Sequence, residues 1–581
     1  MLRPIHVPEV SVRGGGHLRK ISLIALLVLC APFVARAAGG PCPSGANYFD
    51  PNNPSVGVTL SSMGVTNCFY VAANGADSNS GTSEQSPWQH APGMPNCTSV
   101  CASTTPTAGE GFIFRGGDTW HYGSGSPAVG GEWNWKWTGN SSNRIYIGVD
   151  QNWSAAGSWS RPVLNGDNPV VSGGVVSSCA FPMGNTNFVL LNGILYVTFD
   201  NFEFTGMCWN DVPNNGNVHA YLQHFGVGPS YSSSFRTISN NYFHGWTHVT
   251  FNCNGGKGPV CGGAGAIRGD THLEAGTQIV ANVIDGGDSD DLTMNAVDGD
   301  GYIAAYNVIR HVGGTAIMDN CHSLHDNLFE YINNVQDGDT HSDLWFCIGE
   351  APSNNYFYNN TFRYVGTLYN QPLSTIMWFN AQPGFTDYIF NNVGHDVNCA
   401  GNCNNFENPS GMAFAQIFNN TWQSNNTTIW KNGSSTNYTI TTANNHYITP
   451  QGTTCAAVFD KTSTVNGGNT SCSGDVFQTI AAAKAQGYTS ANDFAPTPSS
   501  TATVGTGANE FGLGSLFGTA FLSSTTDSCI YNTANHSVSC PAVNVTSRLS
   551  SGSWDSGAYW SGNANSNQPP APSGLTATVT N

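Results

Sequence analysis

Charge is scarce in this chain. Charged residues make up only 9% of its 581 positions, and 18 Lys and Arg stand against 36 Asp and Glu, which gives a net charge of −18. An acidic surface repels nucleic acid and anionic membranes, so we expect no nucleic-acid partner. It also repels an anionic polysaccharide unless a cation or a local basic patch intervenes. Low charge with 11% aromatic residues is not a disordered composition.

Several signature motifs are also missing. The sequence contains no CxxC pair, which weakens a zinc interpretation, and no P-loop, dinucleotide fingerprint or nucleophile elbow. The one long apolar run is Ile21 to Val34, about 14 residues and too short to cross a bilayer comfortably. Arg19 and Lys20 precede it and Ala35-Arg36-Ala37 follows, which is typical of a signal peptide cleaved after Ala37. We therefore expect a secreted protein, extracellular or periplasmic, with no membrane span.

Removal of residues 1–37 makes the chain more acidic and leaves an even number of cysteines. It takes away five of the 18 basic residues and one of the 36 acidic residues, so 13 and 35 remain and the net charge is about −22. It also removes Cys30, which leaves sixteen of the 17 Cys, and an even number in a secreted chain favours disulfides. Nearest-neighbour pairing predicts Cys42–Cys68, Cys97–Cys101, Cys179–Cys208, Cys253–Cys261, Cys321–Cys347, Cys399–Cys403, Cys455–Cys472 and Cys529–Cys540.

One short phrase recurs between Leu195 and Gly452: apolar residues, an Asn, then another apolar residue. β-Branched and aromatic neighbours indicate strands, and a variable spacing indicates a stack of repeats with insertions in its loops. We predict an all-β, right-handed parallel β-helix, with the Asn at a coil corner, in left-handed backbone and bonded to the Asn of the next coil. A β-sandwich or propeller with Asn-rich turns is the alternative. The phrases centre on Asn201, Asn241, Asn282, Asn307, Asn327, Asn360, Asn392, Asn420 and Asn445.

Both ends of the chain carry motifs with a known resemblance. The first lies in residues 69–88 and 109–123, and the second is an Arg followed by W-D-x-G-A-Y in residues 546–560. They resemble the opening and closing turns of secreted right-handed parallel β-helix proteins, including pectate-lyase-like and chondroitinase-like polysaccharide lyases. The resemblance implies one β-helix over about 69–560 and a structural role for the opening residues. These are Gly75, Asp77, Gly81, Thr82, Pro87, Trp88, Arg115 and Gly116.

The predicted organisation follows from these signals. We expect a signal peptide over 1–37, an N-terminal capping region with the first β-helix turns over 38–190, and central coils over 191–452. C-terminal turns and a cap follow over 453–562, and 563–581 form a Pro-rich tail. An Ala-rich pattern predicts one short helix within 475–488 near the C-terminus. We expect a monomer. The segment WNWKW, residues 133–137, is either a sugar-stacking platform or part of the core of the early coils.

Titratable residues recur just after successive predicted strands. Stacking of the coils brings them to one edge, with carboxylates of neighbouring coils about 5 Å apart and those two coils apart about 10 Å. Such spacings suit acid/base cleavage of a glycan, and mutual repulsion raises at least one carboxyl pKa. The candidate catalytic residues are Arg268, Asp270, His272, Asp298, Asp300, Asp319, His322 and Glu350, with His341 and Asp343 alongside.

Two acidic clusters are candidate Ca²⁺ ligands, because dense carboxylates suit a hard cation. Solvated turn residues that form Asx turns are the alternative for both. In the second cluster, His341 between carboxylates could also be a tuned acid or base. The first cluster is Asp285, Asp288, Asp290 and Asp291, and the second is Asp337 and Asp339, which lead into His341 and Asp343.

These features predict a secreted polysaccharide-active β-helix protein that cleaves a glycan by Ca²⁺-assisted elimination or by acid/base hydrolysis. The Asp trio and the G-H-G and R-I-K elements of the β-helix galacturonan hydrolases are missing from the sequence, which counts against that family. The alternative is a non-catalytic cell-surface or carbohydrate-binding β-helix protein, since fold alone does not determine function.

Overall fold

The chain divides into two compact units, Met1–Ala38 and Gly39–Asn581, in a computed structural model, and the elements below belong to the second unit. No helix within the described residues is long and apolar enough to cross a membrane. The predicted signal peptide and the tail over 563–581 lie outside these residues. The structure describes residues 38–44, 58–183, 187–209, 219–225, 235–249, 264–273, 276–288, 294–313, 315–318, 322–333, 343–347, 354–367, 372–373, 375–380, 384–399, 403–407, 413–432, 438–459, 464–465, 472–514, 519–522, 530–539 and 548–561.

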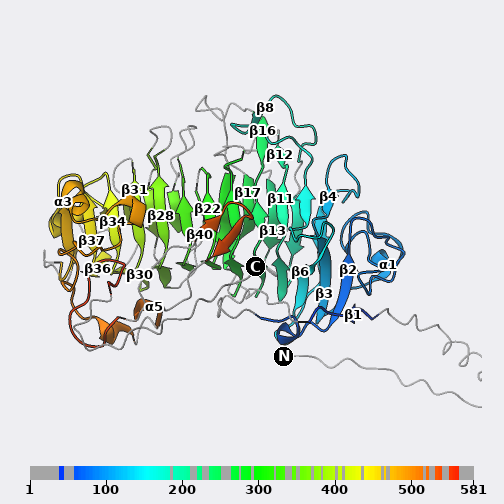
Figure 1. The fold of residues 1–581 in the computed structure, drawn as a ribbon, viewed down its shortest axis with the longest axis horizontal. Coiled ribbons are helices and arrows are strands. Elements are labelled where there is room, and N and C mark those ends of the chain that lie inside the picture. The colour runs from blue at the N-terminus through cyan, green and yellow to red at the C-terminus, as the bar shows by residue number, and fades with distance from the viewer. Residues whose placement is uncertain are drawn as a thin grey trace, which may run out of the picture. The chain divides into compact units, whose positions relative to one another are not determined.

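Three long sheets form the body of this unit (Figure 1). The fourteen-stranded sheet is parallel except where β1 pairs with β2. In order, its strands are β1 (Gly40–Pro41), β2 (Asn67–Val71), β3 (Glu110–Gly116), β6 (Ile145–Ser154), β10 (Val197–Asp200), β14 (Thr237–Ser239), β18 (Gln278–Val280), β21 (Ile303–Ala305), β24 (Ser323–His325), β27 (Asn355–Tyr358), β30 (Thr386–Phe390), β33 (Ala413–Phe418), β36 (Tyr438–Ala443) and β38 (Thr464–Val465).

The twelve-stranded sheet is parallel throughout its recorded pairings. Its strands are short, and apart from β7 and β39 each begins three residues after a strand of the fourteen-stranded sheet ends. In order, they are β4 (Thr119–His121), β7 (Val163–Asn165), β11 (Glu203–Thr205), β15 (Tyr242–Phe243), β19 (Val283–Asp285), β22 (Val308–Arg310), β25 (Leu328–Glu330), β28 (Thr361–Val365), β31 (Val393–Val397), β34 (Thr421–Ser424), β37 (His446–Thr449) and β39 (Val476–Thr479).

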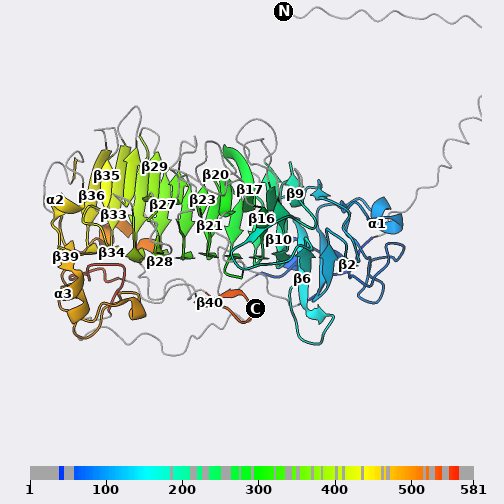
Figure 2. The ribbon, with the colours of Figure 1, turned by 90° about the horizontal axis from the view of Figure 1, so that it is seen from above.

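The ten-stranded sheet, also parallel, lies along another side of the stack, as Figure 2 shows for β17, β20, β23 and β29. In order, its strands are β5 (Trp133–Trp135), β9 (Asn187–Asn192), β13 (His219–Phe225), β17 (Ala264–Leu273), β20 (Met294–Asp300), β23 (Ile317–Met318), β26 (Asp343–Cys347), β29 (Thr375–Asn380), β32 (Asn404–Glu407) and β35 (Trp430–Asn432).

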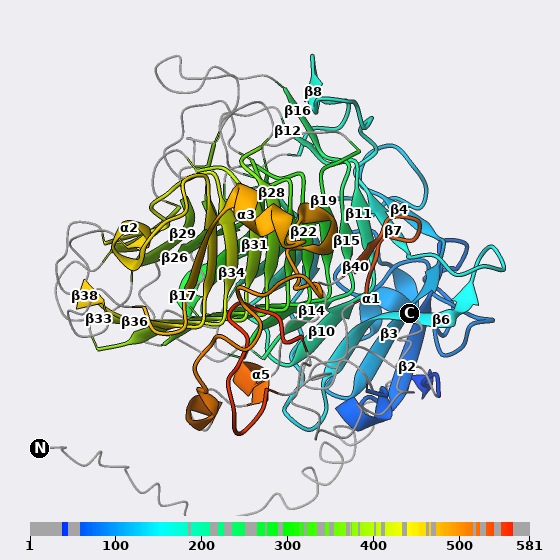
Figure 3. The ribbon, with the colours of Figure 1, turned by 60° about the vertical axis from the view of Figure 1, so that its left-hand side comes forward.

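The chain visits the three sheets in turn. It passes from β10 through β11 to β13, and then returns to β14, which pairs in parallel with β10. Figure 3 shows the three sheets as separate walls of the stack. Successive parallel strands joined by passage through the other two sheets define a parallel β-helix, so the predicted all-β fold is confirmed.

Smaller elements decorate the stack. The Ala-rich helix is confirmed as α3 (Ile480–Ala485), and it begins later than predicted because residues 476–479 form β39. Short helices that the sequence did not predict are α1 (Ser99–Ser103), α2 (Cys455–Val458) and α5 (Thr519–Leu522), with 3₁₀ turns η1 (Ser61–Met63), η5 (Ser490–Asn492) and η6 (Phe511–Leu513). A small sheet holds β8 (Val175–Val176), β12 (Cys208–Trp209) and β16 (Thr247–Val249), and β40 (Ile530–Asn532) and β41 (Ser537–Ser539) form a hairpin.

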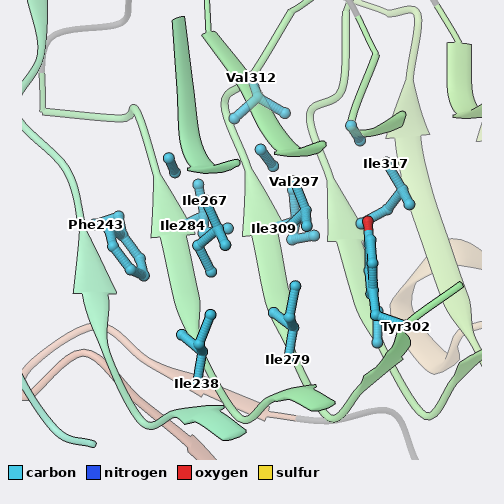
Figure 4. Close-up of a cluster of buried hydrophobic side chains, with 14 of the residues drawn as sticks. Ile238, Phe243, Ile267, Ile279, Ile284, Val297, Tyr302, Ile309, Val312 and Ile317 are labelled. Atoms are coloured by element: carbon cyan, nitrogen blue, oxygen red, sulfur yellow. The ribbon is translucent and has the colours of Figure 1, made fainter. Parts of the chain in front are cut away.

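All three sheets contribute to the apolar interior. Figure 4 shows Ile279 from the fourteen-stranded sheet, Ile284 from the twelve-stranded sheet and Ile267 from the ten-stranded sheet pointing into the same interior. Each is fully buried, and full burial of such a side chain contributes about 1.5–3 kcal/mol. Trp133 and Trp135 of the WNWKW segment are also fully buried in this core, so the core interpretation of that segment is correct for these two rings.

The recurring Asn residues form a continuous ladder. The Asn282 side chain donates to Oδ1 of Asn307 at 3.2 Å and to the Ile238 carbonyl at 2.9 Å, and its backbone N–H donates to the same Oδ1 at 2.9 Å. The pattern repeats through the predicted residues from Asn241 to Asn445, so the bond between coils is confirmed. Each Asn of the ladder thus supplies hydrogen bonds to backbone N–H and carbonyl groups at a turn, where no strand pairing supplies them.

The left-handed residue is not the ladder Asn but the residue before it. Positive φ occurs at Asn240 (55°), Ala281 (56°) and Tyr306 (59°), each directly before a rung. Asn201 is itself such a residue, with φ of 70°, and the ladder position in its coil is Phe202, whose N–H donates to Asn241 Oδ1 at 2.9 Å. The prediction of left-handed backbone at the ladder Asn is therefore wrong by one residue, because the amide must point into the stack.

The terminal motifs have structural roles, as expected for the first. The Asp77 carboxylate accepts hydrogen bonds from the N–H groups of His90 and Thr98 at 2.9 and 3.0 Å, and Trp88 is buried in the core. Arg548 of the closing motif is buried, donates to the Gly557 and Ala558 carbonyls at 3.1 Å, and packs over the Trp554 ring. These contacts fold the closing segment back onto itself.

Five predicted disulfides are present: Cys42–Cys68, Cys97–Cys101, Cys179–Cys208, Cys399–Cys403 and Cys455–Cys472. Cys347 is also disulfide-bonded. The remaining predicted partners lie outside the described residues. For these five pairs, the prediction that each cysteine bonds to the next cysteine in the sequence is confirmed.

We predict that Asn327→Ala lowers the melting temperature markedly. The substitution removes the acceptor of the Asn307 N–H and side-chain amide, both at 3.0 Å, and the donor to the Ala304 carbonyl at 2.9 Å. A buried group left without a partner costs about 1–3 kcal/mol. Thermal unfolding measures the effect, with the exposed Asn425→Ala as the control. Equal melting of the two variants would show that the ladder is not stabilising.

Asp475 ends the ladder and should make stability depend on pH. Its Oδ1 accepts from the Asn445 N–H and side chain at 2.6 and 3.0 Å, and burial raises its pKa to about 7. A pKa raised in the folded state favours folding at low pH, and this contribution is lost as pH rises from about 4 through about 7. Asp475→Asn removes this titration. The melting temperature of the variant minus that of the parent should therefore increase between about pH 4 and pH 7, and this difference should be constant above that range. A pH-independent difference would contradict the assignment.

Candidate functional site on the ten-stranded sheet

One row of register positions crosses the whole ten-stranded sheet. The strand pairings place its members side by side, one for each coil, at about 4.8 Å spacing. Their neighbours along each strand, such as Ile267, Val297 and Trp345, belong to the core, so the row alternates to the outer face. We call it the outer row: Asn134, Leu190, Gln223, Arg268, Asp298, Met318, Phe346, Trp378, Asn405 and Lys431. For Met318 and Asn405 the structure describes the backbone positions only.

The polar centre of the outer row is an ion pair. Arg268 on β17 lies directly beside Asp298 on β20, with Nε 3.5 Å from Oδ2. Asp298 is only 9% exposed, and burial raises the pKa of its carboxyl, while the charge of Arg268 partly offsets the rise. The expected rise in a carboxyl pKa is present, but its cause is burial beside an arginine, not a stacked carboxylate.

The register corrects the predicted alignment of the coils. We expected carboxylates of neighbouring coils to lie side by side, whereas Arg268 pairs with Asp298 and Leu273 pairs with Asp300. The register of the pairing shifts between Arg268 and Leu273, and no sequence pattern predicts this shift. These residues also lie within β17 and β20, not after them. For Asp270, His272 and Asp300 the structure describes the backbone positions only.

An aromatic pair continues the outer row beyond Asp298. Phe346 is two coils away and Trp378 three coils away, with their rings edge to face at a centroid distance of 5.6 Å. Phe346 is 5% exposed and Trp378 is half-buried, and neither belongs to the core cluster. Sequence analysis missed both. The segments LWFC and TIMWFN could have revealed them, because every second residue of a strand faces outward.

Two other candidates are described, with different outcomes. His322 lies on the turn before β24, and burial lowers its pKa, which keeps the imidazole neutral. Asp343 is fully buried at the start of β26, and its carboxylate accepts hydrogen bonds from the N–H and hydroxyl of Thr375. Asp343 is therefore part of the interior and not a residue of the accessible edge. Asp319, His341 and Glu350 lie outside the described residues.

The first predicted metal cluster lies on the twelve-stranded sheet, away from the outer row. Asp285 Oδ1 lies 2.8 Å from Nδ1 of His311, and Asp288 Oδ2 lies 2.7 Å from Nδ1 of His244. Asp285 also faces Arg310 at 3.8 Å. Asp285 and Asp288 therefore each have side-chain partners within the chain, and the Ca²⁺ assignment at this cluster stays a prediction. Asp290, Asp291, Asp337 and Asp339 lie outside the described residues, and within those described no group of three or more His, Cys, Asp or Glu is placed to hold a metal.

Asp285 instead begins an ion row along the twelve-stranded sheet. Arg310 lies 3.6 Å from Glu330, and Arg363 lies 2.6 Å from both Glu330 and Asp493. Alternating charges in register on successive coils attract one another, which offsets the desolvation cost of burying Glu330. Asp493 follows η5 in the C-terminal region, so this ion row attaches the returning chain to the coils and is structural.

Comparison with known proteins returns no matching family model and no matching curated protein. Among solved structures, the chain is similar to a lacto-N-biosidase of glycoside hydrolase family 136 from Eubacterium ramulus, with 13% identity, a TM-score of 0.42, and coverage of 71% of this chain and 66% of that chain. It thus spans slightly under two thirds of that protein's length.

Two polysaccharide lyases are also among the similar structures. Pectate lyase Pel9A has 14% identity, a TM-score of 0.30, and coverage of 83% of this chain and 96% of that chain. A mannuronic acid specific family 6 lyase from human gut microbiota has 14% identity, a TM-score of 0.34, and coverage of 60% and 76%. Both are named as polysaccharide lyases, the group whose terminal motifs this sequence resembles. TM-scores below 0.5 do not define an activity.

The Ca²⁺ prediction can be tested on the two clusters separately. If Ca²⁺ raises the melting temperature of chelator-treated protein, we expect the same rise in Asp285→Asn, since Asp285 is paired with His311 and Arg310. We expect the rise to be lost in Asp337→Asn combined with Asp339→Asn. Loss of the rise in Asp285→Asn alone would place the ion at the first cluster.

Proposed function

We propose that the chain is a secreted polysaccharide-active protein whose glycan lies along the outer face of the ten-stranded sheet. The observation that carries the proposal is the outer row itself. In one register it combines a buried carboxyl with raised pKa, Asp298, a guanidinium, Arg268, and two aromatic rings, Phe346 and Trp378. Aromatic faces pack against sugar rings, and a carboxyl with raised pKa is the usual proton donor in glycan cleavage.

In this proposal Asp298 donates a proton to the oxygen of the scissile glycosidic bond, and Arg268 positions its carboxyl. Cleavage also needs a group that activates water or abstracts a proton. Asp270 and Asp300 are the candidates by position, since they lie on β17 and β20, two residues beyond Arg268 and Asp298. Separation of the two carboxyls would decide between retention and inversion in a hydrolase.

Secretion is part of the proposal. Five disulfides are supported by the geometry of the described cysteines, and disulfides persist in oxidising compartments. The predicted signal peptide over 1–37 gives the route.

A non-catalytic glycan-binding protein is the second candidate. It is favoured by the ion pair, because Arg268 satisfies Asp298 in the resting structure, and by the aromatic pair, which suffices for binding without chemistry.

The test is Asp298→Asn assayed on uronate and neutral polysaccharides, with unsaturated-product absorbance and reducing ends as the two readouts. Loss of an acid/base residue lowers the rate by about 10²–10⁴-fold, with little change in the melting temperature. Asp326→Asn is the matched control, because Asp326 lies at a left-handed corner, which Asn tolerates, beside His325. Full activity of Asp298→Asn would place the chemistry elsewhere, and glycan binding without any cleavage by the parent would favour the second candidate.

A further inference from the structure

We infer that the outer row takes a neutral glycan and not a polymer of uronic acids. This inference rests on the proposed function and adds the charge class of the substrate. Three observations carry it: the commitment of the cationic side chains, the position of the aromatic pair, and the charge of the chain.

The arginines that the structure describes are all committed to partners within the chain. Arg115 pairs with Asp118, and Arg310 and Arg363 belong to the ion row. Arg268 pairs with Asp298. The remaining four donate to main-chain carbonyls: Arg144, Arg161, Arg236 and Arg548. A guanidinium already neutralised by a carboxylate offers little net attraction to a second anion.

At the outer row the balance of charge is near zero. Among its described side chains the charged ones are Arg268, Asp298 and Lys431. Lys431 lies five coils from Asp298, about 24 Å away at the spacing of parallel strands, and its charge is screened beyond about 8–10 Å in physiological salt. A uronate beside Asp298 would therefore meet one compensated cation.

The aromatic pair gives the row an apolar stretch next to the proposed proton donor. Phe346 lies about 10 Å and Trp378 about 15 Å from Asp298 along the stack. A glycan of several sugar residues that reaches Asp298 from this side must place a sugar ring on the half-buried Trp378, whose ring is supported by the edge-to-face contact with the buried Phe346. The C–H faces of a neutral sugar gain from this contact, whereas a carboxylate held at an apolar surface loses hydration without a partner.

The long-range field acts in the same direction. Without residues 1–37 the chain carries 35 acidic and 13 basic residues, and such an excess slows the approach of a polyanion and favours neutral ligands by default. Elimination at a uronate also requires neutralisation of its carboxylate, for which the described part of the outer row offers only the paired Arg268. The inference thus favours hydrolysis over elimination.

The experiment measures binding and cleavage of two oligosaccharide panels by the full chain. The neutral panel contains gluco-, xylo-, manno- and N-acetylglucosamine oligomers, and the acidic panel contains oligogalacturonate and oligomannuronate. We expect at least one neutral oligomer to bind with the same affinity at low and at high salt, on the order of 50 and 500 mM, which bracket physiological ionic strength. The affinity should not change because binding forms no charge pairs. Trp378→Ala should weaken binding about tenfold or more, and Phe346→Ala should weaken it less, because Phe346 is buried and acts only by supporting the Trp378 ring.

The control variant is Tyr388→Ala, which removes a half-buried ring on the fourteen-stranded sheet and should leave binding unchanged. Binding confined to uronates, salt-dependent and weakened by Trp378→Ala, would overturn the neutral class while the site stands. Glycan binding that neither Trp378→Ala nor Phe346→Ala weakens would overturn the proposed site itself. Failure of every oligomer to bind or be cleaved would overturn both.

Discussion

The stacked side-chain amides of the Asn ladder are the constraint on which the rest of the structure depends. Each rung ties the N–H of one turn to the next coil and the amide N–H to a carbonyl of the previous coil. Because a slip of one residue reverses every side chain between core and surface, a fixed corner sets which residues face outward. The outer row and the ion row both exist because coils of different length restart in the same register.

The three sheets of the stack carry different kinds of side chain on their outer faces. The twelve-stranded sheet carries the alternating charges from Asp285 to Asp493, and the C-terminal chain attaches there. The hairpin β40–β41 packs on the same side, where Arg310 lies over the Tyr531 ring. The fourteen-stranded sheet is covered in part by α5 and the closing motif around Trp554. The ten-stranded sheet carries Arg268, Asp298, Phe346 and Trp378 in one register row.

Burial and charge act together at Asp298. Burial raises the pKa of this carboxyl, and Arg268 limits the rise, which is the direction that the proposed role as proton donor requires. The same Arg268 is thereby lost as an anchor for an anionic sugar. In the proposed function, the Arg268–Asp298 pair therefore bears on both the proton donor and the charge class of the ligand.

The sequence by itself determined the repeat, the ladder residues, five local disulfides and the structural role of the terminal motifs. These features are local or periodic, so composition and spacing specify them. It could not determine that Phe202 and not Asn201 occupies the first ladder position, since both fit the same phrase. Only the tertiary structure decided that Arg268 faces Asp298, that Asp343 is buried against Thr375, and that Asp285 pairs with His311. These depend on an irregularity within β17 and on which strands become neighbours across insertions of different length, and no local pattern records either.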